Sequence, residues 1–263
     1  MEFKKCYFEI IKIPKWRWIV AAIFIIFGLW GGYDYTLFSG CPNNVSFFEL
    51  SLYQNNDQIY LCILIALPIL LVLSGVKQNE ISRFTYKHSV LLIAFLCFLI
   101  TIVLIICNII SYLLYPGLEI SFVNEYSSSV FSSSTLKPIW LLCISYLLIF
   151  LRVMFCASCV FRYNYIFKSE LGIIIPILIA VIDLVFNSIF NIQNPLYILP
   201  IEHTRVLFSE AEVPNFMNIE RPSIILSIIY WFVLISIVNF VGFVVQRKRK
   251  EMENKHEVYL GAD

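Results

Sequence analysis

The sequence predicts an all-α membrane protein with six transmembrane helices. Its 263 residues contain six long apolar stretches, 60% of the residues are hydrophobic and only 14% are charged, whereas soluble domains carry roughly 25% charged residues. Each stretch has about the 17 to 25 residues with which a helix crosses the hydrocarbon core. Backbone groups in lipid need partners within their own segment, which a helix provides. The unbroken apolar runs exclude the alternating pattern of a membrane β-barrel.

The six spans are assigned to one transmembrane domain that covers residues 1–263. The predicted spans comprise residues 16–33, 59–75, 89–115, 139–161, 171–190 and 223–245, and residues 246–263 form a tail. The first span lacks a small-residue cleavage site and leads directly into further apolar runs. It is therefore predicted to be a membrane helix and not a cleaved signal.

Lysine and arginine residues gather on one side of these spans. Most of the 19 basic residues lie in the N-terminal segment, the second and fourth connectors and the tail: Lys4, Lys5, Lys12, Lys15, Arg17, Lys77, Arg83, Lys87, Arg162, Lys168, Arg247, Lys248, Arg249, Lys250 and Lys255. The other connectors contain only Lys137, Arg205 and Arg221 and are otherwise acidic. Because basic residues remain on the cytoplasmic side, both termini are expected there.

An amphipathic helix is predicted ahead of the first span. Its apolar residues recur at helical spacing at positions 3, 7, 10 and 11, and Pro14 interrupts the pattern. Trp16 and Trp18 then mark the level of the lipid headgroups, where aromatic side chains gather. The helix is expected to lie in the inner membrane interface. The alternative is a short unstructured basic segment.

Two charged residues lie deep inside predicted spans. Arg152 belongs to the fourth span and Asp183 to the fifth, and with a rise of 1.5 Å per residue both lie roughly 15 to 20 Å from the cytoplasmic boundary. An isolated charge there costs at least about 2.5 to 3.5 kcal/mol, so we expect the two side chains to pair. Asn187, one turn after Asp183, would extend the polar face. The pair can be a structural bridge or serve substrate binding or gating; the third alternative is snorkelling without contact.

Two further polar residues are isolated within apolar helices. Asn108 belongs to the third span and Asn239 to the sixth. Amide side chains between membrane helices usually form interhelical hydrogen bonds. We expect both asparagines to do so and not to bind a ligand.

The connector between the fifth and sixth spans contains an apolar segment that is too short to cross. We call residues 195–208 the outer segment. Its distinguishing residues are Pro195, Pro200, Glu202, His203 and Arg205. A short apolar stretch interrupted in this way is typical of a re-entrant or interfacial element. The outer segment is therefore predicted to enter the outer face of the bundle.

The sequence contains no catalytic or nucleotide-binding signature. No glycine is followed by lysine, which excludes the Walker A motif, and neither H-E-x-x-H nor G-x-S-x-G occurs. The histidines His88, His203 and His256 lie in separate connectors, so they cannot share one metal ion. The basic tail is explained as a membrane anchor. We therefore expect no catalytic residue, metal site, cofactor or nucleic-acid partner in this chain.

Several features together resemble the permease subunits of type-2 ATP-binding cassette exporters. These are six spans with internal termini, the amphipathic helix before the first span, the basic connector Ile81–Lys87 and the interrupted outer segment. The connector resembles that of small bacterial permeases for antimicrobial-peptide export and self-immunity. The stretch Ser223–Tyr230 and the basic tail are similar to their final helix. The resemblance covers nearly the whole chain, through hydropathy and loose motifs.

The resemblance implies a transport subunit that lacks its own motor. Two such subunits pair as a homodimer or heterodimer in the bacterial cytoplasmic membrane, and separate ATPase subunits, which bind ATP and Mg²⁺, dock on the inner connectors. The residues that match the docking positions are Glu80, Arg83, Lys87, Arg162 and Lys168. The sparse charge of residues 76–88 departs from the family pattern. The expected substrate is a peptide or another amphipathic compound.

Two other functional classes follow from the same sequence. The chain can be a stand-alone membrane sensor or immunity protein that binds its ligand through the acidic outer loops. An intramembrane enzyme is disfavoured, because Arg152 and Asp183 are the only pair of strongly polar groups that share one depth.

Overall fold

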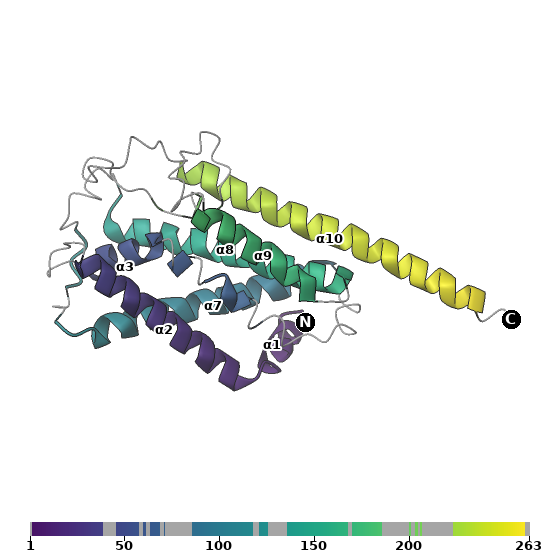
Figure 1. Ribbon diagram of the computed structural model, residues 1–263, viewed down its shortest axis with the longest axis horizontal. Coiled ribbons are helices and arrows are strands. Elements are labelled where there is room, and N and C mark those ends of the chain that lie inside the picture. Colours follow the sequence, from purple (N-terminus) through teal and green to yellow (C-terminus); the bar gives the residue numbers. More distant parts are fainter. Residues whose placement is uncertain are drawn as a thin grey trace.

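The computed structural model is a helical bundle (Figure 1). It describes residues 2–38, 46–57, 60–61, 64–68, 71, 86–117, 121–125, 136–167, 170–185, 200, 203–204, 206 and 223–260. Every regular element within these ranges is a helix, which agrees with the predicted all-α class.

Among the described residues, four helices are long and apolar enough to cross a membrane. They are α2 (Lys15–Phe38), α7 (Tyr86–Leu114), α8 (Pro138–Phe167) and α10 (Ile224–Leu260). These helices occupy four of the six predicted spans, namely 16–33, 89–115, 139–161 and 223–245. The prediction of an all-helical protein with several helices of membrane-spanning length is therefore confirmed.

The predicted second and fifth spans are not established as spanning helices. Residues 59–75 are described only in short pieces. In the region of the fifth span, the 3₁₀-helix η2 (Glu170–Ile173) leads into α9 (Ile174–Leu184). The 11 residues of α9 are fewer than the about 17 that a span needs. Pro176 is accommodated because it lies in the first turn of α9, where its missing N–H breaks no helical hydrogen bond.

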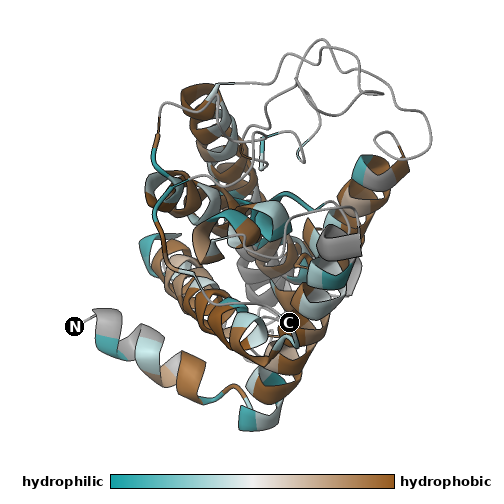
Figure 2. Ribbon diagram, turned by 90° about the vertical axis from the view of Figure 1, so that its left-hand side faces the viewer, coloured by the Kyte–Doolittle hydropathy of each residue, from teal (hydrophilic) through white to brown (hydrophobic). Residues whose placement is uncertain are grey.

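Helix α8 lies at the centre of the bundle. Helices α10, α7, α3 (Phe47–Asn56) and α9, together with η2, all pack against it. The outward faces of the other spanning helices are apolar, as the hydropathy colouring shows (Figure 2), and they expose large side chains such as Phe27, Phe98 and Phe240. Exposed apolar surface of this extent fits lipid as the surrounding solvent.

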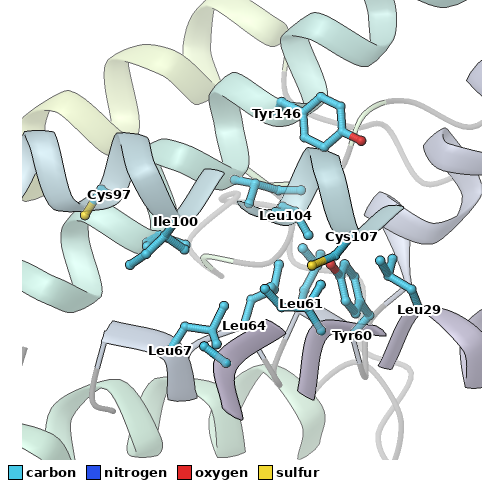
Figure 3. Packing of buried hydrophobic residues seen from close by; sticks show 14 of the residues in the cluster. Leu29, Tyr60, Leu61, Leu64, Leu67, Cys97, Ile100, Leu104, Cys107 and Tyr146 are labelled. Carbon is cyan, nitrogen blue, oxygen red and sulfur yellow. The ribbon is translucent and has the colours of Figure 1, made fainter. Parts of the chain in front are cut away.

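One part of the core lies between α2, α7 and the described residues of 60–71. Tyr60, Leu61 and Leu64 point toward Leu104 and Cys107 of α7 (Figure 3), and all five side chains are buried. Phe47, at the start of α3, adds an edge-to-face contact with Tyr112 at 5.3 Å between ring centroids. Aromatic pairs prefer this geometry. The contacts of Tyr60, Leu61 and Leu64 hold these residues inside the bundle.

The predicted N-terminal helix is present as α1 (Glu2–Ile11). Its side chain Ile10 is buried in the core, whereas Tyr7 and Ile11 are exposed, and the helix contacts α7. The chain then turns at Pro14, whose carbonyl accepts a hydrogen bond from the Arg17 N–H at 3.0 Å as α2 begins. The apolar residues of α1 are therefore divided between the bundle and the exposed surface.

Helix α10 does not end with the predicted sixth span. It continues to Leu260 and extends away from the other helices toward the C-terminus (Figure 1). Arg247 and Glu251, one turn apart, form an exposed ion pair at 3.1 Å. Such pairs support a helix in water. The first part of the predicted tail is thus a helical extension of the last span.

The close packing of η2 on α8 depends on a glycine. A Cβ at Gly172 would lie 2.7 Å from the backbone N of Asn164 and 3.0 Å from the carbonyl O of Val160. Because these are backbone atoms of α8, they cannot move aside as a side chain can. We expect Gly172→Ala to lower the free energy of unfolding by about 1 to 3 kcal/mol, the usual cost of overpacking.

The matched control for Gly172→Ala is Gly31→Ala. A Cβ at Gly31, in α2, meets no atom within 4 Å, and alanine is favoured over glycine in a helix by about 1 kcal/mol. Unfolding of both variants in detergent by denaturant titration checks the prediction. Equal stability of the two variants would contradict the packing of η2 on α8.

Candidate functional site

The two charged residues predicted deep in the bundle form an ion pair. The Nη2 atom of Arg152, in α8, donates to Oδ2 of Asp183, in α9, at 3.0 Å. The side chains are 2% and 0% exposed, respectively. The structure therefore brings together the two predicted partners and removes both charges from the surrounding lipid. Its geometry is that of a bridge between α8 and α9.

Arg152 is also joined to the outer segment. Its Nη1 atom donates to the Thr204 hydroxyl at 3.2 Å, and that hydroxyl donates to the Pro200 carbonyl at 2.9 Å. Thr204 is fully buried. The Nε atom of Arg152 has no hydrogen-bond partner in the described part of the chain. A residue of the outer segment thus shares the guanidinium with Asp183.

Helix α10 holds His203 of the outer segment in place. The imidazole stacks on Tyr230 with 3.8 Å between ring centroids and an interplanar angle of 15°, and its Nδ1 lies 3.2 Å from the Ser227 hydroxyl. The indole Nε1 of Trp231 donates to the His203 carbonyl at 3.0 Å. His203 and Trp231 are both buried. His203 is therefore anchored through its ring and its backbone.

These contacts involve the few residues of the outer segment that the structure describes, and its assignment as a re-entrant element stays a prediction. Four residues of the segment are described, Pro200, His203, Thr204 and Val206, and the last three are buried. Pro195, Glu202 and Arg205 lie outside the described residues. The same holds for Asn187, which was predicted to extend the polar face of Asp183.

Of the five predicted docking residues, two are described. Lys87 is exposed in the first turn of α7, as a docking residue requires. Glu80, Arg83 and Lys168 lie outside the described residues. For Arg162 the predicted location in an exposed connector is wrong: α8 continues through this position to Phe167, and the side chain is only 3% exposed.

Arg162 is buried because neutral groups of α7 and α10 surround its guanidinium. It donates from Nε to Asn239 at 3.2 Å, from Nη1 to Gln246 at 3.3 Å and from Nη2 to Ser89 at 2.6 Å. The guanidinium carbon also lies 5.5 Å from the ring centroid of Tyr86, within cation–π range. We call these four residues, together with Arg162, the Arg162 cage.

Both predicted interhelical asparagines form such bonds. Asn239 Nδ2 donates to the Ser158 hydroxyl at 3.0 Å, in addition to its contact with Arg162. Asn108 Nδ2 donates to the Tyr146 hydroxyl at 3.0 Å, and its Oδ1 accepts from the hydroxyls of Tyr33 and Ser51. Asn108 therefore joins α7 to α8, α2 and α3.

Sequence reasoning missed the short helix α3, whose Ser51 bonds to Asn108. Its polar residues Ser51, Gln54, Asn55 and Asn56 are all at most 3% exposed, although the segment lies in the connector between the predicted spans 16–33 and 59–75. A signal was present: Ser46 precedes the helix, and its hydroxyl accepts from the Glu49 N–H at 3.3 Å. Serine followed three residues later by glutamate is a typical helix start.

The polar residues around α3 are not all saturated with hydrogen bonds. The buried side-chain atoms without a partner in the described part of the chain include Oδ1 of Asn56 and the hydroxyls of Tyr60, Ser111 and Ser145. These four residues belong to α3, residues 60–61, α7 and α8, respectively. Native proteins leave few such groups, and each one is a candidate contact for something else. We call Asn108, its three partners and these four residues the α3 polar cluster.

The described residues contain no metal centre. Within these ranges, no three His, Cys, Asp or Glu side chains come together in a way that could hold a metal ion. The α3 polar cluster consists instead of hydroxyls and amides, and the Arg152–Asp183 pair is ionic. These groups can donate and accept hydrogen bonds and stabilise charge.

The comparisons with known proteins identify no relative. No protein-family model, curated protein or solved structure matches the chain. The resemblance to exporter permeases therefore remains a prediction from the sequence.

Proposed function

We propose that this chain is the membrane-spanning subunit of an ATP-driven exporter in the cytoplasmic membrane of a bacterium. The observation that carries the proposal is α3, a short polar helix buried within a bundle whose outer surface is apolar. Interrupted helices at membrane depth persist where protein buries them or where they line a polar cavity. Transporters use such helices at their substrate sites.

The chemistry of the α3 polar cluster suits the proposed substrate class. The hydroxyls of Tyr60, Ser111 and Ser145 and the amide oxygen of Asn56 have no partner in the described part of the chain. A peptide backbone offers both N–H donors and carbonyl acceptors, and these groups need partners when they leave water. The apolar side chains of Leu61 and Leu64 lie close by (Figure 3) and suit the other half of an amphipathic molecule.

Energy for transport would come from a partner chain. The sequence lacks a Walker A motif, so ATP and Mg²⁺ would be bound by separate ATPase subunits on the cytoplasmic side. Lys87 is the residue that we propose as a contact for such a partner, since it is exposed where α7 begins. A second permease subunit would complete the translocation path, and both termini would face the cytoplasm.

Copurification tests this proposal directly. The tagged chain, extracted from its native membranes in mild detergent, should bring down an ATPase subunit. Lys87→Glu should reduce the recovered ATPase about tenfold, because reversing a contact charge costs on the order of 1.4 kcal/mol or more. Mass spectrometry of the eluate measures the ratio of the two chains.

The matched control is Lys137→Glu, at an exposed lysine just before α8. It should leave the recovered ATPase unchanged, because the proposed topology places Lys137 on the opposite side of the membrane. Complete absence of an ATPase from the wild-type eluate would remove the exporter assignment.

A second candidate is a stand-alone sensor or immunity protein. It is favoured by the direct hydrogen bond between Thr204 of the outer segment and Arg152 inside the bundle. A ligand that displaced the outer segment from outside would change the surroundings of the ion pair at once. Ligand binding by the purified chain, with no ATPase present in the native complex, would favour this candidate.

A further inference from the structure

Arg162 is a buried cation without a counter-ion in the described part of the chain. Its guanidinium has five N–H groups, of which three donate to the neutral side chains of Asn239, Gln246 and Ser89. No carboxylate in the described ranges forms an ion pair with it. Two N–H groups therefore remain without a side-chain acceptor there.

Arg152, on the same helix, is a buried cation whose charge is compensated by a carboxylate. It is buried to a similar extent, and Asp183 accepts one of its hydrogen bonds at 3.0 Å. A buried charge is stable only when it is paired and hydrogen-bonded. The Arg162 cage supplies the hydrogen bonds and not the opposite charge. Within the described residues, an anion is the component that the Arg162 cage lacks.

The position of Arg162 along the spans indicates where that anion would come from. The candidate membrane span of α8 ends at Asn164, the span of α7 begins at Tyr86, and the span of α10 ends at Arg249. Arg162, Tyr86 and Gln246 thus lie close to one end of three spans. Lipid phosphates are located at this depth, just outside the hydrocarbon core.

The surrounding charge favours an anion at the same end. Lys87 is exposed beside Tyr86, and Arg247 and Lys248 follow Gln246 on α10. Basic clusters at the end of membrane helices attract anionic headgroups. The planar guanidinium also matches the oxygens of a phosphate through two parallel hydrogen bonds.

We propose that the Arg162 cage binds an anionic phosphate group, with the guanidinium donating its remaining N–H groups to two phosphate oxygens. The phosphate belongs either to the headgroup of an anionic phospholipid or to free phosphate. The proposal stands on the contacts of Arg162 and does not depend on the exporter assignment.

The experiment compares phosphate sources on the full-length chain in a neutral detergent. Thermal unfolding is followed during titration with short-chain phosphatidylglycerol, with short-chain phosphatidylcholine and with inorganic phosphate, against chloride at equal ionic strength. A rise in Tm with phosphatidylglycerol alone assigns the site to a lipid headgroup. A rise with inorganic phosphate as well assigns it to the phosphate group itself. No preference over chloride and phosphatidylcholine would overturn the proposal.

Two variants decide whether Arg162 is responsible for binding the phosphate group. Arg162→Gln should weaken the apparent affinity for the effective ligand by about 10- to 100-fold, the range that a lost charged hydrogen bond gives. Arg247→Gln, which removes an exposed charge on α10 and breaks only its pair with Glu251, should change the affinity by less than about threefold. Equal weakening in both variants would mean general attraction to the basic end and would contradict a site at Arg162.

A second measurement applies if Arg162→Gln does not fold. Wild-type protein is purified from membranes, and the phospholipid that remains bound is identified by native mass spectrometry. Retention of an anionic phospholipid that excess phosphatidylcholine does not displace supports the proposal. Wild-type protein that retains none and shows no Tm response to phosphate contradicts it.

Discussion

Arg152→Met should lower the free energy of unfolding by about 3 to 5 kcal/mol, the range measured when one member of a buried ion pair is removed. The reason is that the Asp183 carboxylate, which is 0% exposed, would lose its cationic partner inside the bundle. The outer segment would also lose the bond between Arg152 and Thr204. Unfolding in mixed micelles, followed by circular dichroism, measures the change.

The double variant Arg152→Met/Asp183→Leu tests whether the loss of stability comes from the unpaired Asp183 carboxylate. Because both charges are absent and similar volumes fill the space, most of the stability should return. Thr204→Val serves as a control for the bond to the outer segment, with an expected loss of about 0.5 to 1.5 kcal/mol. Losses that simply add in the Arg152 and Asp183 double variant would contradict direct contact.

Burial of the ion pair could be predicted from the sequence because hydrocarbon makes charge costly. Arg152 and Asp183 are strongly polar residues in otherwise apolar runs, and counting residues from the basic ends places them at one depth. The same reasoning applied to Asn108 and Asn239, which both bond to neighbouring helices. The cost of polar groups in hydrocarbon therefore predicted the Arg152–Asp183 pair and the interhelical hydrogen bonds of both asparagines, although not the partners of the asparagines.

Sequence reasoning failed where polar side chains are surrounded by other parts of the protein and not by lipid or water. Helix α3 contains the polar residues Gln54, Asn55 and Asn56 and lies between two predicted spans, yet all three residues are buried against other helices. Polar side chains can enter a bundle when neighbours such as Asn108 and Tyr146 supply hydrogen bonds. These neighbours are remote in sequence, and no local pattern shows them.

Arg162 was misplaced for a related reason. Hydropathy ends the fourth span near residue 161, but a helix needs only backbone hydrogen bonds to continue, and α8 runs on to Phe167. Gly242 of α10 leaves room for the arginine, since a Cβ there would lie 2.8 Å from Cβ of Arg162. The packing of two distant helices therefore decides whether this cation is buried.

Trp231→Ala should lower the free energy of unfolding by about 3 to 5 kcal/mol, as removal of a fully buried tryptophan does. The indole is 0% exposed, lies 5.7 Å from the Phe155 ring between centroids and holds the His203 carbonyl. The variant should therefore open a cavity between α8 and α10 and release the outer segment. Denaturant titration measures the first effect, and hydrogen exchange of the peptide that contains His203 and Thr204 measures the second.

Two matched variants separate these effects. Trp231→Phe keeps most of the ring but cannot donate to the His203 carbonyl, so it should cost about 0.5 to 1.5 kcal/mol and still accelerate exchange of the outer segment. Phe232→Ala truncates the adjacent exposed ring and should change stability by no more than about 0.5 kcal/mol. If Trp231→Phe left exchange of the outer segment unchanged, the indole bond would not hold that segment in place. The covering of the Arg152–Asp183 pair would then depend on the bond of Thr204 to Arg152 and on the contacts of His203 with Tyr230 and Ser227.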